Sequence, residues 1–256
     1  MLVETYGLTN IGKRRELNED SYGIFGFVGD KAVEGFAVLA DGMGGHNAGE
    51  IASAKAVELI SSELGESFSE CDPEKLTVDM ANAIDYANAK IYEMSLSNSE
   101  QAGMGTTTVI IAVKEGSVQI ANIGDSRAYF ISGDKIERIT VDHSVVEQLI
   151  ISGTITREEA KNHPDKNIIT RALGTESYID ADFFRYEPKI GDVLLACSDG
   201  LTEMVGEEQI RDIIKNSESL EKAANGLIET ANENGGVDNI TVVLIKFTDE
   251  EQEGNE

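Results

Sequence analysis

The sequence predicts an α+β fold in which antiparallel sheets carry helices packed on their outer faces. Two observations favour it. Short segments rich in β-branched and aromatic residues come in runs, whereas segments with a helical spacing of apolar residues are long and separate. Turn residues also join neighbouring strand candidates, as in hairpins. A doubly wound parallel sheet would alternate strands with helices, so that class is disfavoured.

The candidate strands are short apolar segments bounded by small and polar residues. Turn residues at 114–117 and 132–134 predict hairpins between the strands on either side. The candidates are Gly35–Ala40, Thr106–Val113, Val118–Asn122, Arg127–Ile131, Lys135–Thr140, Asp192–Cys197 and Ile240–Phe247.

Three long segments have the composition of helices: Ala48–Leu64, Pro73–Leu96 and Leu220–Glu233. In the second, apolar residues recur close to helical spacing. Asp72 is expected to cap this helix, with Pro73 at its first position, because a proline there lacks only an amide that would be unpaired anyway.

Composition excludes several classes of protein. A net charge of -26 over 256 residues repels phosphate backbones, which disfavours nucleic acid as a partner. The two cysteines, Cys71 and Cys197, indicate neither a disulfide framework nor a zinc site. Met1–Gly12 lacks the pattern of a signal peptide, and no apolar segment has membrane-spanning length. The sequence therefore predicts a soluble, cytoplasmic protein without a membrane partner.

One large domain, residues 1–248, accounts for nearly the whole chain. No linker rich in Pro, Gly or Ser divides it, and its length suits a single sizeable core. Residues 249–256 are acidic and lack large apolar side chains, so they are expected to form a disordered tail.

Four aspartates share one local setting, at a strand end beside small residues. Asp41 and Asp199 each precede glycine after an apolar strand, Asp125 follows Gly124, and Asp238 leads into the last strand. A single Asp-Gly pair is most often an ordinary turn. Four of them, together with the Asn18–Asp20 acidic segment, favour a shared cluster of oxygen ligands.

Such a cluster predicts a definite chemistry. Carboxylates without thiolates or paired histidines favour Mg²⁺ or Mn²⁺ over Zn²⁺. Two such ions about 3.5–4 Å apart can lower the pKa of a shared water and offset charge on a phosphoryl group. Arg15, four residues before Glu19, has the planar group that grips two phosphate oxygens, although Lys13–Arg15 also reads as a solvated basic run.

Five motifs together resemble the metal-dependent protein phosphatase family of type 2C, in its compact bacterial form. Their order and spacing extend through the chain apart from the tail. They are Arg15-Glu-Leu-Asn-Glu-Asp20, Asp41-Gly-Met-Gly-Gly45, Gly105-Thr-Thr-Thr108, Gly124-Asp-Ser-Arg127 with Cys197-Ser-Asp-Gly200, and Asp238-Asn239.

The resemblance implies a four-layer α-β-β-α sandwich of two antiparallel sheets flanked by helices. It also implies hydrolysis of phosphoserine and phosphothreonine in proteins by a water that bridges two Mn²⁺ or Mg²⁺ ions. Bacterial relatives commonly oppose a serine/threonine kinase, so a cognate kinase and its targets are expected partners. A mobile flap is implied at Ile150–Gly174. A monomer is expected.

The resemblance also implies roles for individual residues. Asp41 would bridge the two ions, with Asp199 and Asp238 on the first. Glu19 and the carbonyl of Gly42 would serve the second ion. The other assignments are Arg15 for the substrate phosphate, Asp125 with Asp199 for a third, weaker ion, and Asp20 and Asn239 as supporting residues.

One departure concerns the general acid. The eukaryotic branch has a histidine directly after the Asp-Gly pair, whereas this chain has Met43. The acid must then be another group or a metal-bound water, and none of His46, His143 and His163 is favoured by its surroundings in the sequence.

Two rival functions remain to be weighed. A cysteine-based phosphatase needs an arginine six residues after its nucleophile, but Glu203 and Thr77 stand at those positions. The alternative is a pseudophosphatase, a catalytically weak phosphopeptide-binding or regulatory module. Loss of a metal-binding aspartate would favour it, and every expected one is present.

Overall fold

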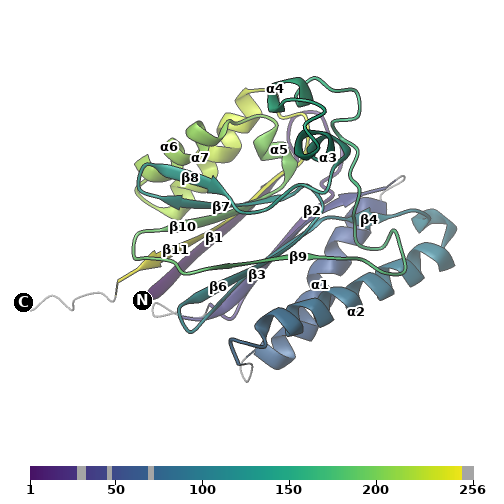
Figure 1. Ribbon diagram of the computed structural model, residues 1–256, viewed down its shortest axis with the longest axis horizontal. Coiled ribbons are helices and arrows are strands. Elements are labelled where there is room, and N and C mark those ends of the chain that lie inside the picture. Colours follow the sequence, from purple (N-terminus) through teal and green to yellow (C-terminus); the bar gives the residue numbers. More distant parts are fainter. Residues whose placement is uncertain (28–32, 45–47, 69–71, 250–256) are drawn as a thin grey trace, which may run out of the picture.

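Two antiparallel sheets face each other and are covered by helices on both outer sides (Figure 1). The structure is a computed structural model that describes residues 1–27, 33–44, 48–68 and 72–249. This four-layer arrangement confirms the α+β sandwich that the sequence predicts.

The first sheet has the strand order β1-β11-β10-β7-β8. Strand β11 lies between β1, the first strand of the chain, and β10, so the two ends of the described chain pair along one ladder. The bounds are β1 Leu2–Asn10, β7 Arg127–Ser132, β8 Lys135–Arg138, β10 Val193–Cys197 and β11 Ile240–Thr248.

The second sheet has the order β2-β3-β5-β6-β9, and the short strand β4 pairs with the end of β3. Its central strands are buried along most of their length because helices cover one face and the first sheet covers the other. The bounds are β2 Asp20–Phe25, β3 Gly35–Met43, β4 Gly105–Thr106, β5 Thr108–Lys114, β6 Ser117–Ile123 and β9 Asp182–Tyr186.

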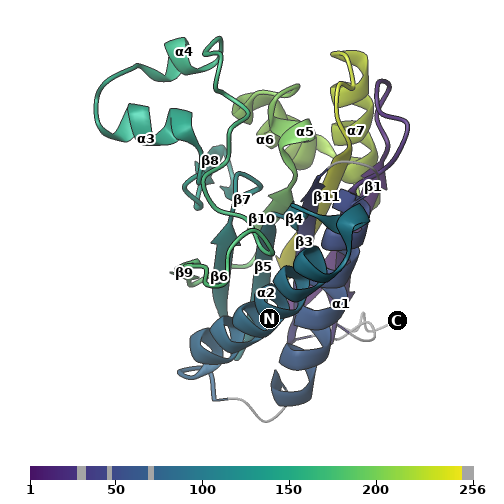
Figure 2. The same cartoon turned by 90° about the vertical axis from the view of Figure 1, so that its right-hand side faces the viewer.

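Helices form the two outer layers. The long pair α1 and α2 covers the second sheet, and α5, α6 and α7 cover the first (Figures 1 and 2). Two further helices, α3 and α4, stand away from the layers (Figure 2). The bounds are α1 Ala48–Phe68, α2 Leu76–Ser97, α3 Val145–Ile151, α4 Arg157–Ala160, α5 Asp199–Thr202, α6 Glu207–Asn216 and α7 Leu220–Glu233, with a 3-10 turn at Ser99–Gln101.

Three apolar cores hold the four layers together, one between the sheets and one beneath each helical layer. The core between the sheets joins Leu39 and Ile111 of the second sheet to Leu194 and Val243 of the first. Burial of these side chains from water fixes the sheets face to face. The polar ends of the strands therefore meet along one edge of the sandwich.

All seven predicted strands and all three predicted helices exist, and α7 has the predicted bounds. The predicted start of the second helix is wrong. Asp72 accepts the amide of Glu74 through its side chain and that of Lys75 through its carbonyl, so it forms a turn before α2 instead of a cap. No helix in the described ranges is both long and apolar enough to cross a membrane.

Candidate metal centre

The acidic residues singled out in the sequence converge at one edge of the sandwich. Asp41 ends β3 and Asp125 follows β6 in the second sheet, while Asp199 follows β10 and Asp238 precedes β11 in the first. The two sheets therefore each contribute a pair of carboxylates. They surround a hollow of about 230 Å³ lined by Arg15, Glu19, Asp41, Gly42, Met43, Gly44, Thr107, Asp125, Asn167, Ile169, Asp199, Glu203 and Asp238.

Two threonines hold the backbone of Asp41 from both sides. Thr107 accepts the amide of Asp41 through its hydroxyl at 3.0 Å and donates its own amide to the Asp41 carbonyl at 2.9 Å. The hydroxyl of Thr106 donates to the same carbonyl at 2.9 Å. Thr107 also shares a hydrogen bond with Ser126 at 2.7 Å. The clamp that Thr106 and Thr107 form on Asp41 is therefore connected to the turn that carries Asp125.

Gly42 has no room for a side chain. A Cβ there would lie 2.1 Å from the carbonyl oxygen of Gly49 and 2.6 Å from that of Glu19. The amide of Gly42 donates to the Glu19 carbonyl at 3.0 Å. Glycine thus lets the end of β3, the Glu19 segment and the first turn of α1 pack together around the hollow.

Gly42→Ala is expected to lower the free energy of unfolding by about 1–3 kcal/mol, because backbone atoms must move to admit the methyl group. Chemical denaturation measures this loss. Gly206→Ala is the matched control, since nothing lies within 4 Å of its Cβ and its φ is −72°. It should cost less than about 1 kcal/mol. Equal losses in the two variants would contradict the close packing at Gly42.

Glu19 is held by its backbone and by the start of a helix. Its amide donates to the Asn239 side-chain oxygen at 2.8 Å, and the Asn239 amide group donates to the carbonyls of Ile11 and Leu17, each at 2.9 Å. The amide of Gly49 in α1 donates to the Glu19 carboxylate. Asn239 thus positions the segment that carries both Arg15 and Glu19, in line with the predicted supporting role.

Asp20 lies directly behind the hollow. It pairs with Asp41 across β2 and β3, and one of its oxygens accepts the hydroxyls of Ser198 and Thr241, each at 2.7 Å. Its other oxygen, Oδ1, is buried without a hydrogen-bond partner. Burial raises the pKa of Asp20 to about 6, against the effect of the two hydroxyl donors.

Arg15 lies at the rim of the hollow, with 46% of its side chain exposed. Its Nη2 donates to Asp238 Oδ2 at 2.7 Å, and Nη1 lies 3.7 Å from Glu19 Oε2. The sequence places Arg15 on the substrate phosphate. The structure places it at the hollow, where it is paired with a predicted metal ligand.

Negative charge is crowded at the centre of the site. Burial raises the pKa of Asp41 well above its ordinary value, and repulsion from Asp20 and Asp199 raises it further. The pKa of Asp199 is likewise raised, first by burial and then by repulsion from Asp125. For Asp125, burial and the nearby Asp142 raise the pKa to about 6. Buried carboxylates of this kind are stabilised by a cation.

The donor set fits hard divalent ions. It consists of carboxylate and carbonyl oxygens, and the one described cysteine nearby, Cys197, is fully buried with a pKa that burial raises to about 12. Among the described residues, no three acidic, histidine or cysteine side chains already close around a single point. Mg²⁺ characteristically keeps several waters and takes few carboxylates, so an open arrangement is compatible with it.

Neither of the two histidines that the structure describes lines the hollow. His143 is buried and accepts the Gly124 amide at 3.1 Å, and burial lowers its pKa. It therefore positions the turn before Asp125. His163 accepts the amide of Asp165 within its own loop. His46 lies outside the described residues, and Met43 lines the hollow.

Several residues of the site were not singled out as functional from the sequence. Thr106, Thr107 and Ser126 fall within the quoted motifs, but only the structure shows which backbone groups they hold. Asn167 and Glu203 line the hollow but belong to none of the quoted motifs, although Glu203 lies four residues after Asp199. Asparagine and glutamate on polar segments give no sequence pattern that predicts this convergence.

Comparisons with known proteins agree on one family. The sequence model of the family described as "Protein phosphatase 2C" matches residues 12–240. "Serine/threonine phosphatase stp" of Listeria innocua is 40% identical over 238 residues, which is 93% of each chain. "Protein phosphatase PhpP" of Streptococcus pneumoniae is 38% identical over 251 residues, covering 96% of this chain and 98% of the relative.

Solved structures give the same result. Serine/threonine phosphatase Stp1 from Staphylococcus aureus superposes with a TM-score of 0.87 at 38% identity, over 97% of this chain and 96% of that one. The catalytic domain of the serine/threonine protein phosphatase PstP, in complex with two manganese ions, superposes with a TM-score of 0.82 at 31% identity, over 97% and 99% of the two chains.

Proposed function

The chain belongs to the protein phosphatase 2C family and is a metal-dependent protein serine/threonine phosphatase, and we propose that the hollow between the sheet ends is its catalytic centre. The observation that carries this proposal is the convergence of four carboxylates from two sheets beside an arginine. Its substrates are phosphorylated proteins. The pseudophosphatase alternative finds no support, because the relatives at 40% and 38% identity are named as phosphatases.

We assign the ligands as the resemblance implies. Asp41 would contribute to holding both ions, Asp199 and Asp238 would complete the ligands of the first, and Glu19 with the carbonyl of Gly42 would hold the second. When bound, two divalent ions would lower the pKa of a shared water and offset charge on the phosphoryl group. The raised pKa values of Asp41 and Asp199 support this assignment, because burial and the neighbouring carboxylates disfavour their charged forms and bound cations would compensate that effect.

The chain's own groups position the reactants. The clamp of Thr106 and Thr107 fixes the direction in which Asp41 leaves β3. Asp20, with Ser198 and Thr241, provides a buried acceptor directly behind it. Such rigid support is what holds a reacting group near its productive geometry. Asp125 with Asp199 is our candidate pair for a third ion.

Arg15 is assigned to the substrate phosphate because its planar group can bond two phosphate oxygens. Its pairing with Asp238 keeps the guanidinium beside the hollow before substrate enters. Arg15→Ala is expected to raise KM for a phosphothreonine peptide about tenfold or more while Mn²⁺ affinity is retained, as for a lost charge-assisted contact. Arg14→Ala, a change at the exposed neighbour, is the matched control. An unchanged KM in Arg15→Ala would remove this arginine from the phosphate site.

Turnover of phosphoserine and phosphothreonine peptides with Mn²⁺ tests the function directly. Release of phosphate from both, and from p-nitrophenyl phosphate, is the expected result. Peptide binding without phosphate release would favour the pseudophosphatase. A cognate serine/threonine kinase, a monomeric state and a cytoplasmic location stay predictions of the sequence.

A further inference from the structure

One lobe of the molecule is attached to the rest along a narrow base. We call it the α3–α4 arm, residues 144–170. Backbone bonds close its base, from the amide of Val145 to the carbonyl of Ile168 at 2.9 Å and from Thr170 to His143 at 2.7 Å. Figure 2 shows α3 and α4 standing out from the sandwich. The arm overlaps the flap expected at 150–174; its first and last residues each lie a few positions earlier than those of the flap.

The arm has almost no apolar core of its own. Every one of its residues is described, and none belongs to the three cores of the sandwich. The only buried residue of α4 is Ala160, and the only buried residue of α3 is an acid, Glu147. The apolar residues of α3 are at most partly buried, so hydrophobic burial holds α3 less firmly than it holds the helices of the sandwich.

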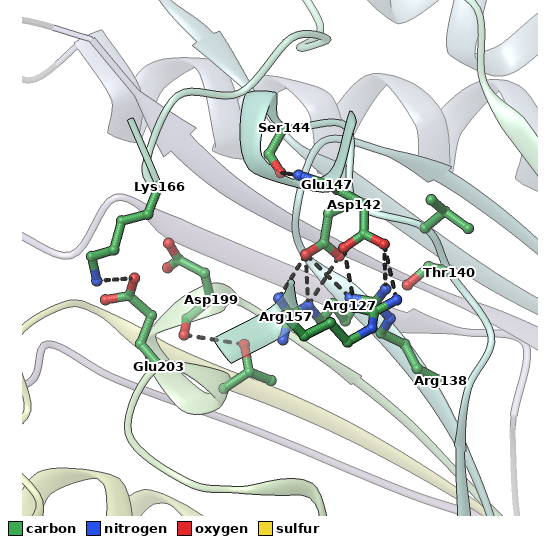
Figure 3. A network of polar contacts seen from close by, with 12 residues as sticks. Arg127, Arg138, Thr140, Asp142, Ser144, Glu147, Arg157, Lys166, Asp199 and Glu203 are labelled. Carbon is green, nitrogen blue, oxygen red and sulfur yellow. Dashed lines mark hydrogen bonds and ion pairs between the residues drawn. The ribbon is translucent and has the colours of Figure 1, made fainter. Parts of the chain in front are cut away.

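Charged groups hold it instead (Figure 3). Oε1 of Glu147 accepts Arg138 Nη2 of β8 at 3.0 Å and Arg157 Nη2 of α4 at 3.1 Å, and Oε2 accepts Arg157 Nη1 at 3.3 Å. Arg138 also lies 3.3 Å from Asp142, which Arg127 of β7 grips through Nη2 at 2.6 Å and Nε at 3.0 Å. A continuous network of ion pairs thus runs from the first sheet into both helices of the arm.

Glu147 is the member of this network that both helices share. Its side chain is 5% exposed and that of Arg138 is 14% exposed, whereas that of Arg157 is 64% exposed. Loss of one partner of a buried pair leaves an uncompensated charge, whereas an exposed pair contributes little. A change at Glu147 should therefore loosen the arm more than a change at Arg157.

The C-terminal end of the arm, at its base, forms part of the hollow. Asn167 and Ile169 line the hollow. Lys166 Nζ lies 2.9 Å from the carboxylate of Glu203, the residue that follows α5 (Figure 3). The position of the arm therefore sets one wall of the hollow. A polypeptide around a phosphorylated residue must pass this wall, whereas a small ester touches less of it.

We propose that Glu147 is a positioning residue that fixes the arm beside the metal centre and thereby sets the affinity for phosphorylated polypeptides over small phosphate esters. The inference rests on the proposed function. It assigns no contact between Glu147 and substrate, because the carboxylate acts through Arg138 and Arg157 on the arm.

Glu147→Gln keeps the size of the side chain and removes its charge. With Mn²⁺ present, KM for a phosphothreonine peptide should rise about tenfold, and KM for p-nitrophenyl phosphate by less than about threefold, as expected of a change remote from the chemistry. Amide hydrogen exchange in 145–170 should accelerate while the melting temperature changes little, because the arm shares no core with the sandwich. Glu158→Gln, a change at a 79% exposed acid of the arm, should leave all of these values unchanged.

Equal rises of KM for peptide and small ester, or unaltered exchange in the arm, would overturn the proposal. Should Glu147→Gln fail to fold, Arg157→Gln is the variant to measure. Its KM for the peptide should rise about threefold, and an unchanged KM would overturn the proposal. A wild-type protein that releases no phosphate from peptides would instead overturn the proposed function. Hydrogen exchange separates the two failures, because it reports the anchoring of the arm without turnover.

Discussion

Asp238→Asn is expected to lower turnover by at least about a thousandfold on every substrate, because a neutral amide cannot hold a hard cation as a carboxylate does. The substitution preserves size, and its amide oxygen can still accept the Asn239 amide that Asp238 Oδ1 accepts at 2.8 Å. The loss should therefore reflect charge and not folding. Steady-state kinetics with peptide and with p-nitrophenyl phosphate measure it.

Asp125→Ala is the contrasting variant. Because Asp125 is assigned only to a third ion, tight Mn²⁺ binding should persist and only turnover should fall. Isothermal titration with Mn²⁺, run on both variants, separates the two roles. If Asp125→Ala abolished tight binding while Asp238→Asn retained it, the division of the carboxylates between the ions would be wrong.

Removal of divalent ions should abolish activity and also destabilise the fold in a pH-dependent way. Asp20 and Asp125 have folded-state pKa values of about 6, and burial raises the pKa values of Asp41 and Asp199 well above their ordinary value. Such groups favour the protonated folded state. The stability they contribute is present below their unfolded pKa, near 4, and is lost as pH rises through and above 6.

Bound ions would compensate the same charges, so the melting temperature of the Mn²⁺-loaded protein should exceed that of the EDTA-treated protein by more at pH 8 than at pH 5. Thermal scans across this range measure the difference. In EDTA, Asp41→Asn should flatten the pH dependence because it removes one buried titrating group. Full activity in EDTA would contradict a metal centre held by carboxylates. So would a difference in melting temperature between the Mn²⁺-loaded and EDTA-treated proteins that does not depend on pH.

Much of the sandwich could be predicted because its central strands are buried on both faces. Thr108–Lys114 and Val193–Cys197 are buried throughout, and their composition shows it. The edge strands β1 and β9 are half-buried for most of their length, so they lack a clear apolar signal. Helix α6 was missed although Ile210 and Ile214 are buried four residues apart.

Some features of the site could also be predicted from the sequence, and others only from the fold. Asp41, Asp125 and Asp199 were found because each comes after an apolar strand segment and lies beside glycine, and Asp238 because it leads into the last strand. The ion pair of Arg15 with Asp238 joins residues 223 positions apart, and no local pattern predicts it. Glu147 was missed for a related reason. An acid within an apolar helix segment normally faces solvent, and only the fold brings Arg138 and Arg157 to it.

The central claim is that carboxylates from both sheets hold two ions in one hollow. Anomalous scattering from crystals grown with Mn²⁺ tests it most directly. Two strong peaks are expected, one contacted by Asp41, Asp199 and Asp238, the other by Asp41, Glu19 and the carbonyl of Gly42. Manganese peaks that lie away from Asp41, or a hollow without any peak in crystals of active protein, would contradict it.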